Sequence, residues 1–82
     1  MPTVLRVDGF AVMIFLPDRE HGPAHVHVFR GEGEVVIFLN EDGEAVTIRD
    51  SQRMSPRDAW RALQIVEDHA TELRHQWRKY HG

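Results

Sequence analysis

Turn-forming residues divide the first fifty positions into short apolar runs, and this spacing restricts the possible fold more than any other feature. Asp8-Gly9 separates two such runs, and Asp-Gly in this setting is a strong signal for a two-residue hairpin turn. Turn residues recur at Gly31–Gly33 and at Asn40–Gly43. Connections this short join antiparallel neighbours. We therefore expect residues 1–49 to form an antiparallel meander of four or five strands.

The runs between these turns have the composition of strands. Residues 10–16 and 34–39 are apolar on both faces of an extended chain, so we expect them to be central and covered on both sides. Residues 44–48 alternate and should form a short edge strand, whereas residues 49–54 are polar and should form a linker. The predicted strands cover residues 3–7, 10–16, 24–30, 34–39 and 44–48.

The remaining residues have the period of a helix. Ser55 suits the N-cap position and Pro56 the first helical position. Apolar residues then recur at spacings of three and four, which predicts one long C-terminal helix over residues 55–81, packed on one sheet face. The fold class is therefore α+β, in a single domain of residues 1–82. The apolar stripe consists of Ala59, Leu63, Val66, Ala70, Leu73, Trp77 and Tyr80.

Composition narrows the functional classes. The chain has 82 residues, a formal net charge of −3 and no cysteine. These values exclude a disulfide framework and give only weak support for binding RNA or DNA. Nothing is typical of a signal peptide or a membrane span, so we expect a cytoplasmic protein that does not bind membranes. One helix covers only one face of a sheet that is apolar on both, so we expect a homo-oligomer or a small protein partner to hide the other.

Three of the six histidines lie within one seven-residue stretch. His25 and His27 alternate with valines, which places both imidazoles on one face of a strand. His21 precedes Gly22-Pro23, a pair typical of turns, and should lie on the loop before that strand. Imidazole titrates near neutral pH and binds metals, so these histidines are the candidate functional site.

Three roles are open for this site. A metal site would use His21, His25 and His27 as ligands and Glu20 as a fourth ligand or a base, and zinc or another divalent transition metal suits such donors. An RNA-cleaving site would use the same histidines as acid and base. An arginine would then stabilise the developing charge, and the candidates are Arg6, Arg30 and Arg49. In the third role the strand histidines are hydrogen-bonded structural residues.

The start of the predicted helix carries two further features. Arg53, Arg57 and Arg61 recur every four residues and form a basic ridge, which is either a solvated face or a contact for nucleic acid. Trp60 lies beside the apolar stripe, where it either widens the core contact or binds a partner.

Several of these segments together resemble a family of small prokaryotic proteins catalogued as domain of unknown function 4160. The resemblance covers nearly the whole chain. The family commonly has Pro-Pro before His-Val-His-Val, where this chain has Pro23-Ala24. The segments that carry the resemblance are the opening Met1–Arg6, Asp8-Gly9-Phe10, Glu20-His21, His25–Val28, the glycines Gly31 and Gly33, and the run from Ala62 to Gly82.

The resemblance implies one component of a two-gene cassette with a small partner, of the kind suspected to be toxin–antitoxin pairs. We therefore expect a protein-interaction module. The alternative is a small metal-dependent or RNA-cleaving enzyme that uses His21, His25 and His27. An interaction module should keep partner binding when His25 is replaced by Gln, whereas an enzyme should lose activity.

Overall fold

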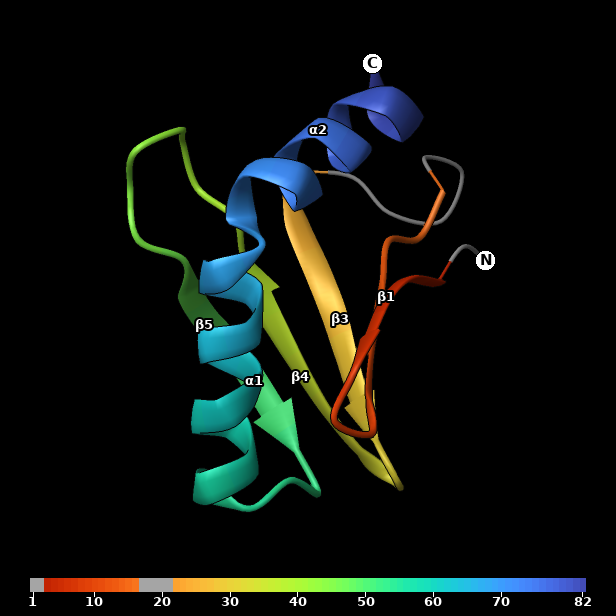
Figure 1. The fold of residues 1–82 in the computed structure, drawn as a ribbon, viewed down its shortest axis with the longest axis vertical. Coiled ribbons are helices and arrows are strands. Elements are labelled where there is room, and N and C mark those ends of the chain that lie inside the picture. The colour runs from red at the N-terminus through yellow and green to blue at the C-terminus, as the bar shows by residue number, and fades with distance from the viewer. Residues whose placement is uncertain (1–2, 17–21) are drawn as a thin grey trace.

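The computed structural model describes residues 3–16 and 22–82 and has a five-stranded sheet followed by two helices (Figure 1). Each strand pairs antiparallel with the next, in the spatial order β1-β2-β3-β4-β5. The expected α+β class and antiparallel meander are confirmed. The elements are β1 (Thr3–Val7), β2 (Phe10–Met13), β3 (His25–Arg30), β4 (Gly33–Phe38), β5 (Thr47–Gln52), α1 (Pro56–Asp68) and α2 (Ala70–His81).

The Asp8-Gly9 turn forms as the sequence predicts. Both residues have positive φ, 51° at Asp8 and 82° at Gly9, which is the backbone of a type I′ hairpin turn. The flanking residues Val7 and Phe10 are partners in the β1–β2 register. Phe10 is 1% exposed, so the turn directs the next strand into the core.

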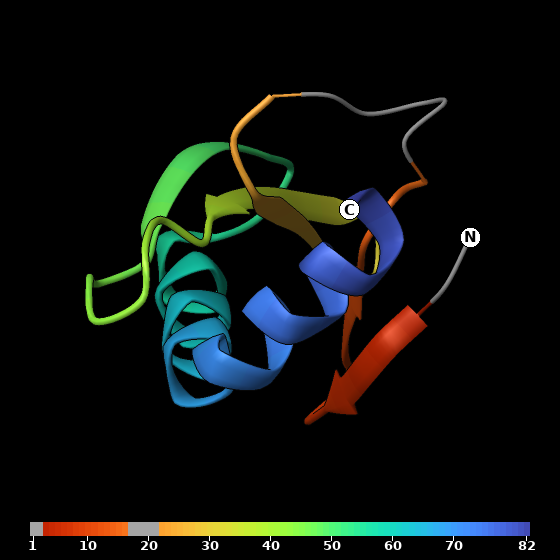
Figure 2. The same ribbon diagram turned by 90° about the horizontal axis from the view of Figure 1, so that it is seen from above.

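The core lies between one sheet face and the helices. Val12, Val28 and Val35 occupy one row across β2, β3 and β4, and all three are fully buried. Ala62 and Val66 of α1 are equally buried and belong to the same cluster. Figure 2 shows the sheet curving around the two helices. Each fully buried valine contributes about 1.5 kcal/mol or more through burial.

The fifth strand lies later in the chain than the alternation predicts. Residues 44–48 were expected to be the strand and 49–54 a linker, but β5 covers Thr47–Gln52. The register shifts between Val36 and Ile37, so Arg49 is an extra residue in β5 opposite that step. All six residues of β5 are exposed. A strand without a buried face shows no alternation, which is why the pattern misplaced it.

The single long helix predicted over residues 55–81 is wrong, because the chain has two helices that meet at His69. The helix start is as expected, with Ser55 as N-cap accepting a bond from the Asp58 N–H. At His69 the backbone leaves helical geometry (φ −115°, ψ 17°), and the imidazole Nδ1 donates to the Ile65 carbonyl at 2.8 Å. The His69 ring therefore bonds to a backbone carbonyl of α1 at the point where the chain changes direction between the two helices.

The bend has a physical reason in the sizes of the two layers. A straight helix over residues 56–81 would be about 39 Å long, whereas the six-residue strands span only about 20 Å. A straight helix would carry the apolar residues of its last turns beyond the sheet. The bend instead lets α2 cross the end of the sheet (Figure 1), where Leu73 is 1% exposed.

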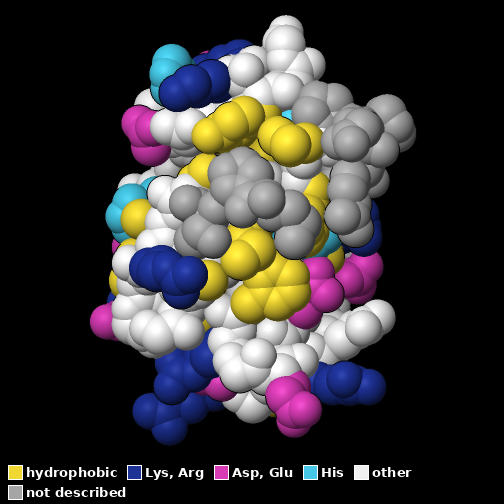
Figure 3. Space-filling model, turned by 90° about the vertical axis from the view of Figure 1, so that its right-hand side faces the viewer, with side chains coloured by type: hydrophobic (Ala, Val, Ile, Leu, Met, Phe, Trp, Pro, Cys, Tyr) yellow, Lys and Arg dark blue, Asp and Glu magenta, His cyan; other side chains and the backbone are white. Residues whose placement is uncertain are grey.

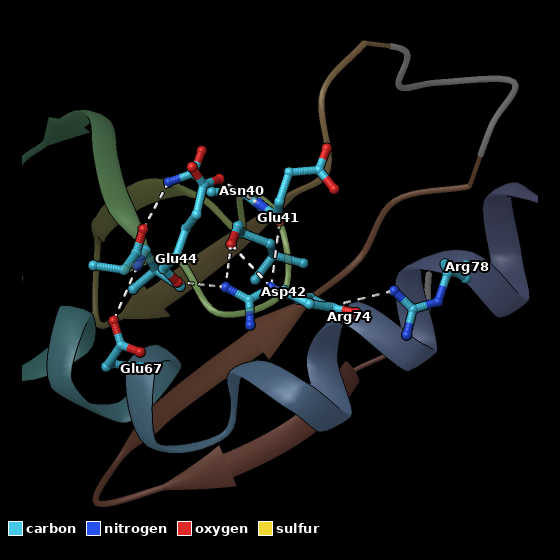
Figure 4. Close-up of polar contacts among 10 residues, drawn as sticks. Asn40, Glu41, Asp42, Glu44, Glu67, Arg74 and Arg78 are labelled. Atoms are coloured by element: carbon cyan, nitrogen blue, oxygen red, sulfur yellow. Dashed lines mark hydrogen bonds and ion pairs between the residues drawn. The ribbon is translucent and has the colours of Figure 1, made fainter.

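A buried arginine fixes the loop between β4 and β5 (Figure 4). Arg74 on α2 is 6% exposed. Its guanidinium donates to the carbonyl oxygens of Leu39 at 2.7 and 3.1 Å, Asn40 at 3.3 Å and Glu44 at 2.8 Å. A charge buried this deeply is stable only where hydrogen bonds replace its water. The loop carbonyls supply these bonds, so α2 helps to determine where β5 begins.

Replacing Arg74 with Met should lower the free energy of unfolding by about 3 kcal/mol, because the buried Leu39 carbonyl loses its donors and the loop loses its anchor. Arg78→Met is the matched control, since Arg78 is exposed on the same helix and makes a 3.7 Å ion pair with Asp42. The control should change stability by less than about 0.5 kcal/mol. Urea unfolding followed by circular dichroism measures both, and equal losses would contradict the anchoring role.

Candidate functional site

The two strand histidines lie side by side on one face of β3, as the alternation predicts. His25 is opposite Phe38 and His27 is opposite Val36 in the β3–β4 register. Their ring centroids are 5.3 Å apart. His25 is 2% exposed and His27 is 6% exposed, within a single chain. Burial of these central positions on the face opposite the valine row therefore does not require a second copy.

His27 forms a carboxylate–histidine pair with Glu34. The imidazole Nδ1 lies 2.7 Å from Glu34 Oε2. With Glu34 ionised, Nδ1 carries the proton and donates it, and Nε2 holds the lone pair. Glu34 comes from β4, where it pairs with Phe29 and so lies diagonally across from His27 on the same face. The predicted three-residue turn at Gly31–Gly33 would place Arg30 opposite Glu34. In the structure Arg30 pairs with Gly33, and this shift of one residue brings Glu34 diagonal to His27.

His25 has a corresponding local partner. Its Nδ1 lies 2.8 Å from the Pro23 carbonyl oxygen. Because a carbonyl only accepts, Nδ1 is the protonated nitrogen and Nε2 holds the lone pair. Both strand histidines therefore have the same tautomer, with the proton on Nδ1 and the lone pair on Nε2.

Helix α2 brings a second group of aromatic side chains to these histidines. The Trp77 ring lies 5.1 Å from His25, and His81 stacks on Trp77 with 3.6 Å between centroids. His81 Nε2 donates to the Phe15 carbonyl at 2.8 Å, and the Phe15 ring meets His27 edge-on at 4.3 Å. We call these five residues the histidine cluster. Trp77 and His81 could not be assigned to this site from the sequence, because only the bend at His69 places them there.

The metal hypothesis stays a prediction. Within residues 3–16 and 22–82, no group of three or more His, Cys, Asp or Glu side chains is arranged to hold a metal ion. His21, a predicted ligand, and Glu20, predicted as a fourth ligand or a base, lie outside the described residues. Of the arginines considered for RNA cleavage, Arg30 contacts Asp8 and Asp58, and Arg49 contacts Asp50. Both therefore have partners away from the histidine cluster.

A second candidate site lies at the β5 edge. Ile48 is 40% exposed although it pairs with the fully buried Ile37. Trp60 on α1 is 60% exposed. Trp60 and Glu67 are two turns apart on one stripe of the helix, and Glu67 accepts the backbone N–H of Val46, just before β5, at 3.0 Å. Trp60 thus lies on the flank of α1 that borders β5. We call β5 together with Trp60 the edge surface.

Residues 9–78 match the family model described as Domain of unknown function (DUF4160). The chain belongs to this family. The matched range includes the strand histidines, Glu34, Trp60 and Trp77, so both candidate sites fall within the family domain. No curated protein and no solved structure matches the chain. Among the described helices, none is long and apolar enough to cross a membrane.

A double-mutant cycle should detect the His27–Glu34 pair directly. We expect a coupling free energy of about 1 kcal/mol between His27→Ala and Glu34→Ala, because each single variant leaves the other partner without its hydrogen bond. Glu32→Ala, on the exposed turn of the same hairpin, should give a coupling near zero with His27→Ala. Thermal and urea unfolding of the variants provide the values. If the two cycles gave the same coupling free energy, Glu34 would not be part of the candidate site.

Proposed function

We propose that this chain is a small protein-interaction module, one component of a toxin–antitoxin-like pair, and that a small partner protein binds its edge surface. The observation that carries this proposal is the combination of an edge strand, β5, whose six residues are all exposed, with a tryptophan that is 60% exposed beside it. Tryptophan is strongly enriched among residues that dominate binding energy at interfaces.

The backbone of β5 supports the addition of a further strand. An edge strand leaves alternate N–H and C=O groups directed away from the sheet, and an extended segment of another protein can pair with them. The strand order makes β5 an edge, and its six residues are long enough for such a pairing.

The side chains of β5 favour a matched partner over indiscriminate pairing. Arg49 is the extra residue at the register shift, and its Nε lies 3.1 Å from Asp50 Oδ2. Charges and bulges on an edge strand disfavour unselective pairing. A partner whose charges complement both Arg49 and Asp50 would bind more tightly than one whose charges do not.

The burial of the histidine cluster supports the same conclusion. His25 and His27 are almost fully buried, and each Nδ1 donates to a neighbour within the fold. Histidines held in this way tie β3 to the preceding loop, to β4 and to α2. A stabilising role accounts for their contacts without a substrate.

Trp60→Ala should weaken binding of the proposed small partner protein by about tenfold or more, because the substitution removes the largest exposed apolar group of the edge surface. The unfolding free energy should change by less than about 1 kcal/mol, since Trp60 is exposed. Lys79→Ala, exposed on α2, is the control and should bind as wild type. Calorimetric titration of the purified proteins measures the affinities.

Unchanged affinity of Trp60→Ala would overturn the assignment of the edge surface. Sedimentation of the chain alone tests the expected homo-oligomer. If the wild-type chain forms a dimer that Trp60→Ala dissociates, the occupant of the edge surface is a second copy rather than a different protein.

One observation favours a second candidate, a small metal-dependent or RNA-cleaving enzyme. Glu34 orients the His27 ring so that Nε2 holds the lone pair, which is the form needed for a general base or a metal ligand. In this function His21 would act with His25 and His27.

Elemental analysis and melting curves of tag-free protein, prepared without added metal or chelator, distinguish the two candidate functions. For an interaction module we expect substoichiometric metal by elemental analysis, and melting temperatures that zinc and nickel leave unchanged. A metal site would instead raise the melting temperature by mass action. Near-stoichiometric metal, or a zinc-induced rise that is absent in the His25→Gln/His27→Gln variant, would decide for the metalloenzyme, and cleavage of RNA lost in that variant would decide for the ribonuclease.

A further inference from the structure

Three arginines line one hollow at the end of the molecule where the β1–β2 turn approaches the start of α1. Arg30 comes from the end of β3, and Arg57 and Arg61 come from the first two turns of α1. The hollow has a volume of about 460 Å³. Figure 3 shows basic and acidic side chains together at its lower end, which is this end of the molecule. We call it the arginine hollow, and its lining residues are Asp8, Phe10, Arg30, Arg57, Asp58 and Arg61.

Two of the three guanidinium groups are held in place by the fold. Arg30 Nη1 donates to the Asp8 carbonyl at 2.9 Å, and its guanidinium carbon lies 4.9 Å from the centre of the Phe10 ring. Arg61 Nη2 donates to the Asp8 carboxylate. Because the Asp8-Gly9 turn holds Asp8 at positive φ, the turn positions the acceptors for both arginines. Such pre-organisation lowers the entropy lost when a ligand is bound.

The third guanidinium belongs to Arg57, which is exposed on the hollow. In the described part of the chain it forms no hydrogen bond and no ion pair. The two carboxylates of the hollow contact the other arginines, with Asp8 bonded to Arg61 and Asp58 3.8 Å from Arg30. The hollow therefore has an excess of positive charge on a chain whose formal net charge is −3.

We propose that the arginine hollow binds a phosphate group, carried by a nucleotide or by single-stranded RNA. Guanidinium groups match phosphate oxygens with paired N–H donors, and a phosphate presents several oxygens to several arginines at once. The hollow opens beside the N-terminus of α1, a helix of 13 residues, whose dipole also favours an anion. The proposal rests on these residues alone and does not depend on the function proposed for the edge surface.

The test is a calorimetric and NMR titration of the full chain with inorganic phosphate, adenosine monophosphate and a five-nucleotide oligouridine. Arg57→Gln should weaken binding by about fivefold or more, because it removes a charged donor that the fold does not otherwise use. Arg78→Gln is the matched control, an exposed arginine on α2 outside the hollow, and should bind as wild type. The amide signals of Asp8 and Gly9 should shift on binding in both the wild type and the control.

Salt dependence identifies the source of the phosphate. If RNA is the ligand, the oligonucleotide should bind more tightly than the mononucleotide, and Arg57→Gln should reduce the slope of log K against log salt by about 0.7. Equal affinity for both would assign the hollow to a mononucleotide. The proposal is overturned if Arg57→Gln and wild type bind these probes equally, if none of them binds, or if a hexaglutamate peptide binds the hollow and phosphate does not displace it.

Discussion

The mismatch between a short sheet and a long apolar stripe determines how the last third of the chain is arranged. The bend at His69 resolves it by placing α1 beside the sheet and α2 across the end (Figure 1). Arg74 can then reach the carbonyl oxygens of the β4–β5 loop, and Trp77 can reach His25. Both the position of the exposed edge strand and the composition of the histidine cluster therefore follow from the change of direction at one residue.

Buried imidazoles add a second constraint, because each buried N–H needs an acceptor. His25 finds one two residues earlier in the chain, and His27 finds one across the hairpin. Loss of either acceptor would leave a buried donor unsatisfied at a cost of about 1–3 kcal/mol. These bonds thus specify the approach of the Pro23 segment and the register of β3 on β4. The same polar groups that suggest chemistry in the sequence also stabilise one arrangement of the sheet.

The sequence predicts local features well and distant ones poorly. The Asp8-Gly9 hairpin and the shared face of His25 and His27 depend on turn chemistry and on a period of two, which neighbouring residues contain. The bend at His69 is different, because no glycine or proline marks it and the apolar spacing continues through it.

The parts of the sites that sequence could not predict come from residues far apart in the chain. The start of β5 depends on Arg74, which is 30 or more residues from the carbonyls it binds. Arg30 reaches Asp8 because β3 pairs with β2, and Arg61 reaches it because the β1–β2 turn meets α1. Spacing along the sequence shows the ridge of Arg57 and Arg61 but gives no reason to add Arg30 to it.

The edge surface and the arginine hollow lie on neighbouring flanks of α1. Glu67, on the Trp60 stripe, contacts Val46 before β5, whereas Arg61 contacts Asp8 in the β1–β2 turn. Trp60 and Arg61 are consecutive residues, so their side chains leave the helix about 100° apart. A protein on the edge surface would therefore leave Arg30 and its contacts in place. Because Arg57 and Trp60 are three residues apart on α1, they are neighbours on its surface. A partner bound over Trp60 would therefore come close to the arginine hollow without any displacement of that helix.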